Sequence, residues 1–317
     1  MISRLSQTWL PVVMTSMPSS KSSSAICGVQ RGLGPSSNVS ATRRPTGGAT
    51  GTSRVLAGGT DVIVQMETDL IEPQLLVDIK KIAELRQIVA ENGGFRVGAA
   101  VPGMEIVNHA AFCQAWPGVV EGVKLIGSIQ IKGRATMGGN LCNASPAADS
   151  VPALVAAGAV ARIVGAKGMR EVPVETIPVA PGKTSLAKDE IVVSLFLPRR
   201  PAHASDAYLR FTPRTEMDIA VVGVGISLTL DDRGICTAAR VALGAVAPTV
   251  LLVREASAAL IATPIDDAAL ERLAQAVSAA CRPIDDKRGT KEYRIKVAGV
   301  VARRTALLAL ERARQNR

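Results

Sequence analysis

The chain has 317 residues, of which 47% are hydrophobic, so it can bury one large core or two medium ones and is neither a fibre nor a disordered tail. Its formal net charge is +10 at pH 7, yet only 3% of its residues are aromatic, which argues against a nucleic-acid-binding module that stacks bases. No apolar run approaches the roughly 20 residues that a membrane-spanning helix needs, and we expect a cytoplasmic protein without a transmembrane segment.

The amino-terminal segment, residues 1–54, carries six of the excess positive charges and no acidic residue. From Met17 onward it is dominated by Ser, Gly, Thr, Pro and Arg and has no apolar periodicity. Such a composition buries too little to offset its ordering entropy, so we predict an atypical segment that is disordered or mistranslated. Basic residues also recur near the other end, where Arg294, Arg303 and Arg304 are expected on the solvated face of a helix.

An ordered domain is expected to begin at Val55, where the composition changes abruptly. Strands are predicted at Gln74–Ile79, Phe95–Val101 and Ile191–Pro198, and helical periodicity runs from Met104 to Ala115. A further helix is expected to end near Gly158, followed by a strand with the sequence VARIV. This alternation of short strands and helices indicates an α/β domain over residues 55–202.

A second unit, residues 203–317, is predicted to be a small antiparallel sheet with helices. Two runs with strand periodicity flank the turn Asp231–Gly234, which is a good hairpin signal. Helices are expected at Asp267–Arg282 and Thr290–Arg314.

The cysteines are too far apart in the sequence to form a zinc or iron-sulfur ligand set. They are Cys27, Cys113, Cys142, Cys236 and Cys281. The chain has only two histidines besides, so we expect reduced thiols and no metal site.

Two glycine-rich loops are the most informative feature: AGGTD at Ala57–Asp61, and TMGGN at Thr136–Asn140, which continues to Asp149. Paired glycines let backbone N–H groups approach a diphosphate. For either loop alone, a simple tight turn is an equally good interpretation. Both loops together favour a dinucleotide site, but Gly223 and Gly225 lack the third glycine of a Rossmann motif.

These two loops, together with the segments DEIVVSLFLP and RTEMDIAVVGV, occur in the order found in a known family. The chain resembles the FAD-binding medium subunits of molybdenum hydroxylases of the xanthine dehydrogenase and aerobic CO dehydrogenase type, from Val55 to the last helix. The resemblance implies an α+β fold. Its FAD-binding domain would be similar to that of vanillyl-alcohol oxidase (the PCMH type), with two α/β subdomains, and a CO dehydrogenase flavoprotein-like C-terminal domain would follow. Residues 1–54 depart from the family, because they lack its Pro-containing strand and its helix rich in Ala and Leu.

The resemblance also implies the cofactor-binding residues, and no catalytic side chain, because electron transfer needs no general acid or base. Asp149 would bind a ribose or ribityl hydroxyl, Ile126 and Val192 would pack near the isoalloxazine ring, and Arg210 would lie near the cofactor. The diphosphate loops would comprise Val55, Leu56, Ala57, Gly58, Gly59, Thr60, Asp61 and Val62 in the first, and Thr136, Gly138, Gly139 and Asn140 in the second.

Some of these assignments have plain alternatives. Judged from the sequence alone, Ile126 and Val192 fit ordinary core positions and Arg210 fits a surface base, while Tyr208 is a further candidate for contact with the ring. A larger side chain at Gly58 or Gly139 is expected to weaken FAD binding much more than folding.

The function implied by the resemblance is electron transfer from an iron-sulfur subunit through FAD to an external acceptor, which could be NAD, oxygen, a quinone or a carrier protein. The partners would be a large molybdenum-cofactor subunit and a small 2Fe-2S subunit, without nucleic acid. Two alternatives stay open: a self-contained flavin oxidase or reductase of the same fold, and a basic scaffold or nucleic-acid-binding protein supported mainly by the net charge.

Overall fold

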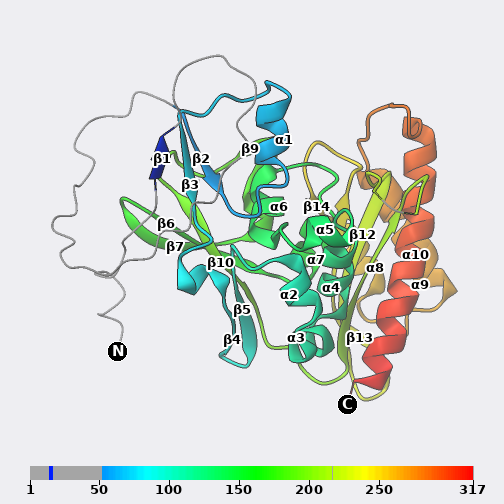
Figure 1. Cartoon of the computed structure of the whole chain (residues 1–317). Helices are drawn as coiled ribbons and strands as arrows, with labels where there is room; N and C mark the ends of the chain where they lie inside the picture. The colour runs from blue at the N-terminus through cyan, green and yellow to red at the C-terminus, as the bar shows by residue number, and fades with distance from the viewer. Residues whose placement is uncertain (1–13, 17–51, 216, 317) are drawn as a thin grey trace.

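The computed structural model describes residues 14–16, 52–215 and 217–316 of the chain, and its fold is α+β (Figure 1). Three sheets with three, five and four strands form its framework, together with a separate two-stranded ribbon. The last of the three sheets is antiparallel and is covered by helices, as the sequence predicts. The expected fold class is therefore confirmed.

The first sheet has the strand order β1-β3-β2 and supplies the first glycine loop. Its strands are β1 (Met14–Ser16), β2 (Ser53–Leu56) and β3 (Leu75–Asp78), and the short helix α1 (Val62–Glu67) lies between β2 and β3 in the chain. β2 and β3 are parallel, whereas β1 pairs antiparallel with β3. The disorder predicted for residues 1–54 falls mostly outside the described residues; its described parts, however, pair as β1 and the start of β2, which corrects that prediction at these positions.

The second sheet has only antiparallel neighbours, in the order β4-β5-β10-β6-β7. Its strands are β4 (Ile88–Glu91), β5 (Gly94–Gly98), β6 (Val160–Gly165), β7 (Gly168–Pro173) and β10 (Ile191–Leu197). β8 (Pro178–Ala180) and β9 (Lys183–Thr184) form the separate ribbon, and η1 (Ala83–Arg86) and η2 (Val174–Thr176) are short 3-10 helices. The strands predicted near β5, β6 and β10 are confirmed, but sequence reasoning missed β4 and β7.

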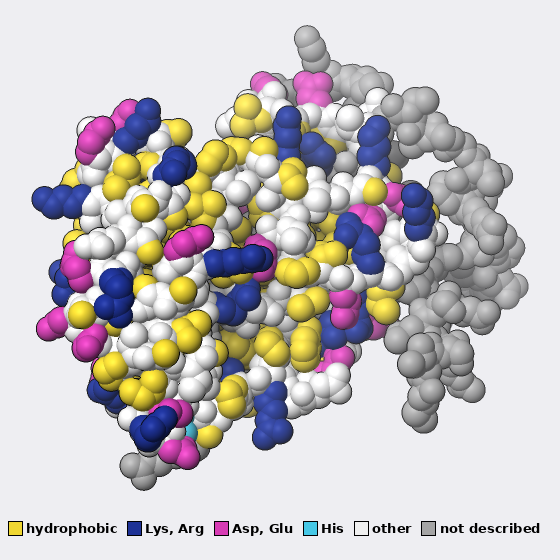
Figure 2. All heavy atoms as spheres, turned by 180° about the vertical axis from the view of Figure 1, so that it is seen from behind, with side chains coloured by type: hydrophobic (Ala, Val, Ile, Leu, Met, Phe, Trp, Pro, Cys, Tyr) yellow, Lys and Arg dark blue, Asp and Glu magenta, His cyan; other side chains and the backbone are white. Residues whose placement is uncertain are grey.

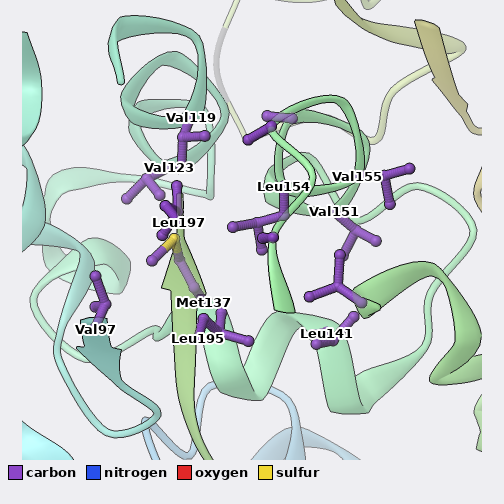
Figure 3. Packing of buried hydrophobic residues seen from close by; sticks show 14 of the residues in the cluster. Val97, Val119, Val123, Met137, Leu141, Val151, Leu154, Val155, Leu195 and Leu197 are labelled. Carbon is purple, nitrogen blue, oxygen red and sulfur yellow. The ribbon is translucent and has the colours of Figure 1, made fainter. Parts of the chain in front are cut away.

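The helices of the first domain bury their apolar side chains against this sheet. Figure 3 shows Leu141, Val151 and Leu154 in the same core as Leu195 and Leu197 of β10. These helices are α2 (Gly103–Val107), α3 (Ala110–Ala115), α4 (Pro117–Lys124), α5 (Ile129–Lys132), α6 (Met137–Asn143) and α7 (Ser150–Ala156).

The single helix predicted over Met104–Ala115 is wrong, because the structure has two short helices there. The chain leaves helical geometry at His109, whose φ of −85° and ψ of 94° are extended. The imidazole Nδ1 of His109 accepts a hydrogen bond from the backbone N–H of Phe112 and so caps α3. Apolar periodicity continues across the break, which is why the sequence reads as one helix.

The third sheet is β11-β12-β13-β14 and lies between two groups of helices (Figure 1). Its strands are β11 (Ala204–Phe211), β12 (Val222–Leu230), β13 (Cys236–Gly244) and β14 (Leu251–Leu252). α8 (Arg254–Leu260), α9 (Asp267–Ala280) and α10 (Lys291–Gln315) pack beside it, while α4 and α7 of the first domain contact its other side. The predicted hairpin at Asp231–Gly234 and both predicted long helices are confirmed.

Ion pairs and hydrogen bonds of charged side chains join the two parts of the chain. Asp206 of β11 accepts hydrogen bonds from the Val119 backbone N–H and from the Arg200 guanidinium at 2.6 Å. Glu121 of α4 pairs with Arg312 of α10, and its carboxylate also accepts from the Tyr208 backbone N–H. Asp206 is 2% exposed, so these contacts place one carboxylate of the second part within the packing of the first.

On the described part of the surface, charges of both signs lie close together. Figure 2 shows basic and acidic side chains interspersed on one face, with apolar side chains between them. Arg294 corrects the prediction of a wholly solvated basic helix face: it is 3% exposed and donates hydrogen bonds to Asp286 and to the Val221 carbonyl. Throughout the described part of the chain, every helix is too short or too polar to cross a bilayer, and the cytoplasmic location stays a prediction.

Candidate functional site

A pocket of about 300 Å³ lies where the first glycine loop, α6 and β10 meet. Its walls come from chain segments far apart in the sequence, beginning with β2 and the loop after it. The lining residues are Arg54, Val55, Ala57–Val62, Gln65, Ile79, Ala99, Ile126, Ala135, Thr136, Gly138–Asn140, Cys142, Asn143, Gly182, Thr184, Leu186 and Glu190–Val192.

The first loop lines this pocket with residues whose backbone N–H groups have no described acceptor. Gly58 and Gly59 are buried, and Gly59 has a φ of +84°, which favours glycine. None of the backbone N–H groups from Gly58 to Asp61 has an acceptor among the residues that the structure describes. At the buried residues Gly58 and Gly59, N–H groups without acceptors are costly, so this loop is suited to a ligand that brings acceptor oxygens.

The position that a Cβ atom would take at Gly58 points at backbone rather than into the pocket. An added Cβ would lie 2.2 Å from the carbonyl oxygen of Arg134 and 2.9 Å from Cα of Ala135. Gly58 is therefore needed for the close packing of the first loop against the segment before the second loop. This packing argues against the expectation that a larger side chain at Gly58 would weaken FAD binding much more than folding.

The second loop enters α6 through the cap residue Thr136, whose hydroxyl accepts from the Gly139 N–H at 2.9 Å. Gly138 packs against Ala99, because an added Cβ would lie 2.7 Å from the Ala99 methyl carbon. At Gly139 an added Cβ would meet Thr136 Oγ1 at 3.0 Å and nothing else closer than 4.0 Å. Gly139 alone of these two glycines leaves open space toward the pocket.

The ionisable groups of the pocket are few. Burial raises the pKa of Asp61, whereas hydrogen bonds from Arg170 and the Ala187 backbone N–H lower the pKa of Glu190 to about 2. Burial raises the pKa of the Cys142 thiol to about 12, so Cys142 stays protonated and is a poor nucleophile. Cys142 is free, as are Cys113, Cys236 and Cys281, while Cys27 lies outside the described residues.

The structure brings most of the predicted site residues together. Both glycine loops except Leu56, and the two apolar residues Ile126 and Val192, line the one pocket. Asp149, Tyr208 and Arg210 do not. Gln65, Asn143 and Glu190 also line the pocket and were not predicted. Asn143 follows Asn140 by three residues and so shares its helix face, a spacing visible in the sequence.

Asp149, Tyr208 and Arg210 instead form a buried cluster behind the pocket. The Arg210 guanidinium donates to Asp149 Oδ2 at 2.6 Å, and the Tyr208 hydroxyl donates to Asp149 Oδ1 at 2.8 Å. The Arg210 side chain is 6% exposed, so the alternative of a surface base is wrong. Arg210 also donates to the Leu125 carbonyl, one residue before Ile126, and thereby holds the wall that Ile126 contributes.

The Asp149 cluster predicts a pH dependence of stability. Burial raises the pKa of Asp149 to about 6, in spite of Arg210 and Tyr208, from a usual value of 3.8. The folded state therefore holds this proton more tightly than the unfolded state, and the contribution of Asp149 to stability falls as the pH rises from about 4 to about 6.

Urea unfolding of wild type and Asp149→Asn across this range checks this expectation. The free energy of unfolding of wild type minus that of the variant should decrease as the pH rises and level off above about pH 6. The difference is used because carboxylates with lowered pKa, such as Glu91, give the opposite slope in both proteins. A constant difference would contradict the raised pKa.

Comparison with known protein families agrees with this geometry. Residues 42–200 match the FAD-binding domain in molybdopterin dehydrogenase, and residues 207–309 match the C-terminal domain of CO dehydrogenase flavoprotein. The first match contains both glycine loops, and the second contains most of β11, all elements from β12 to α9, and most of α10.

Individual relatives share most of their length with this chain. The putative xanthine dehydrogenase FAD-binding subunit of Escherichia coli K12 is 33% identical over 77% of this chain and 84% of that protein. The carbon monoxide dehydrogenase medium chain of Afipia carboxidovorans is 31% identical over 83% of this chain and 90% of that protein. A crystal structure of Cu,Mo-CO dehydrogenase matches with a TM-score of 0.79 and 31% identity, covering 82% of this chain and 90% of that one. The chain therefore belongs to the FAD-binding subunits of the molybdopterin dehydrogenases, a family of oxidoreductases.

Proposed function

We propose that the pocket holds one FAD and that the chain passes electrons from an iron-sulfur subunit to an external acceptor. The chemistry that FAD supplies when bound is the exchange of electrons one or two at a time. The residues of the chain bind and orient the cofactor and exclude water from it. Residues 55–202 would form the cofactor domain and residues 203–317 the C-terminal domain.

The row of N–H groups from Gly58 to Asp61 carries this proposal. These groups lack acceptors among the described residues, and the oxygens of a diphosphate would satisfy them. The rest of the first loop, Val55–Ala57 and Val62, would hold this row in place, and the second loop, with Thr136, Gly138, Gly139 and Asn140, would close on the same group.

The ring of the cofactor would pack against Ile126 and Val192, both of which line the pocket. Arg210 and Asp149 would act from behind the lining rather than by direct contact, since their charged groups bind each other. Two ionisable side chains that line the pocket are poorly suited to proton transfer at neutral pH, because Glu190 stays anionic with a lowered pKa and Cys142 stays a thiol. Such a site fits electron transfer better than proton chemistry on an organic substrate.

The partners would be a large molybdenum-cofactor subunit, where the organic substrate is hydroxylated, and a small 2Fe-2S subunit. The support is that relatives of this chain are described as parts of larger enzymes, such as the 6-hydroxypseudooxynicotine dehydrogenase complex of Paenarthrobacter nicotinovorans. The acceptor would be NAD, oxygen, a quinone or a carrier protein.

Titration of the full-length chain with FAD is expected to show about one bound flavin per chain, measured by the flavin absorption of the protein after gel filtration. Riboflavin should bind at least tenfold more weakly, because it lacks the diphosphate that the N–H row would hold. Inorganic pyrophosphate should compete with FAD. A folded chain that stays colourless after reconstitution, both alone and with its partner subunits, would refute the proposal.

A further inference from the structure

Two asparagines of α6 line the pocket side by side, and in both the amide oxygen is already engaged by the protein. Ser150 Oγ donates to Asn140 Oδ1 at 2.7 Å, and Gln65 Nε2 donates to Asn143 Oδ1 at 3.1 Å. Among the described residues, no acceptor bonds either asparagine Nδ2. Asn140 and Asn143 are three residues apart, so they share one helix face. The free N–H donors of both amides are therefore left for a ligand.

Ser150 cannot touch that ligand itself. It is 0% exposed, is absent from the pocket lining, and begins α7 next to Asp149. Its hydroxyl has one described partner, the Asn140 oxygen. The Ser150 hydroxyl can donate or accept, and here it donates to the amide oxygen; this bond holds the amide plane of Asn140 and leaves its Nδ2–H donors without a protein acceptor among the described residues. With the opposite flip, Asn140 would turn its oxygen toward the ligand and repel an anion.

We propose that Ser150 is a positioning residue of the pocket: it fixes the amide of Asn140 so that the N–H donors face an acceptor-rich anionic group, a diphosphate. Gln65 does the same for Asn143 from α1, and so ties the helix after the first glycine loop to the helix of the second. This inference rests on the proposed function, because the anionic group would be the diphosphate of FAD.

The test is a double-mutant cycle in the full-length chain with FAD as the probe. Ser150→Ala is expected to raise the Kd for FAD about tenfold, and Asn140→Ala is expected to do so at least as much. In the Asn140→Ala background, Ser150→Ala should change the Kd by less than twofold, because the amide that it orients is gone. A purely structural role would weaken binding by the same factor in both backgrounds.

A matched control removes a different buried serine hydroxyl. Ser257 is 8% exposed and accepts from the Val241 N–H in the C-terminal domain, and neither residue lines the pocket. Ser257→Ala should lower the thermal stability about as much as Ser150→Ala does and leave the Kd for FAD unchanged. If Ser150→Ala fails to fold, Gln65→Ala on the half-buried helix α1 tests the same positioning role. Gln65→Ala should raise the Kd for FAD about threefold, and it should have no effect on the Kd in the Asn143→Ala background.

Equal Kd values for wild type and Ser150→Ala, or independent effects of Ser150 and Asn140, would overturn the inference while FAD binding by the wild type upholds the proposed function. A wild-type chain that binds no FAD would overturn both.

Discussion

Alanine at Gly58 is expected to lower the free energy of unfolding of the cofactor-free chain by about 3 kcal/mol, the upper part of the range for overpacking. The added Cβ would lie 2.2 Å from the Arg134 carbonyl oxygen, and three backbone atoms of residues 134 and 135 lie within 3.0 Å of it. Backbone cannot rotate out of the way as a flexible side chain can. The two glycine loops must therefore move apart, and FAD binding should be lost with the packing.

Gly139→Ala is the matched comparison, because it changes the second loop by the same single carbon. Alanine within a helix gains about 0.5–1 kcal/mol over glycine, which roughly offsets a disturbed Thr136 cap worth about 1 kcal/mol. Stability should thus change little. The new methyl group would occupy space that now opens toward the pocket, so the Kd for FAD should rise more than tenfold.

Urea unfolding of both cofactor-free variants and FAD titration of the folded fraction separate the two roles. Equal losses of stability at both positions, with unchanged affinity for FAD at Gly139, would show that both glycines serve only turn geometry.

Replacing Arg210 by methionine is expected to cost about 3–5 kcal/mol at neutral pH, the usual result of removing one partner from a buried ion pair. Methionine fills much of the space of the arginine stem but leaves Asp149, which is 8% exposed, without its cation. The Leu125 carbonyl also loses its donor, so the wall at Ile126 should loosen and flavin affinity should fall.

The loss should shrink in acid, because an unpaired Asp149 takes up a proton and no longer carries a buried charge. It should also shrink in the double variant Arg210→Met with Asp149→Asn. Arg233→Ala serves as the control, because that side chain is 86% exposed and its surface pair contributes little. A cost for Arg210→Met that is independent of pH and of Asp149 would show that the packing of the stem, rather than the ion pair, matters.

Local patterns in the sequence located several of the longer elements. The hairpin at Asp231–Gly234 is set by its turn residues, and α10 is set by its long apolar periodicity. Both can therefore be predicted from the local sequence without knowledge of tertiary contacts. The segment Met104–Ala115 was predicted as one helix because its apolar spacing persists across the break. The break itself depends on the imidazole of His109 capping the second helix, which apolar spacing does not reveal. The strands β4 and β7 were missed because they are edge strands with weak alternation.

The sequence by itself determined the two glycine loops and the division of the chain into two sets of elements, because glycine pairs and periodicity are local properties. The loops and the family resemblance together indicated one dinucleotide cofactor. Only the tertiary structure decided that Gly139 faces the pocket and that Gly58 packs on backbone, because Gly58 and Arg134 are far apart in the sequence and meet only in the folded chain. It likewise decided that Arg210 and Arg294 are buried rather than solvated. A basic residue carries no local mark of burial: its environment is set by distant segments that supply a carboxylate and close the space around it.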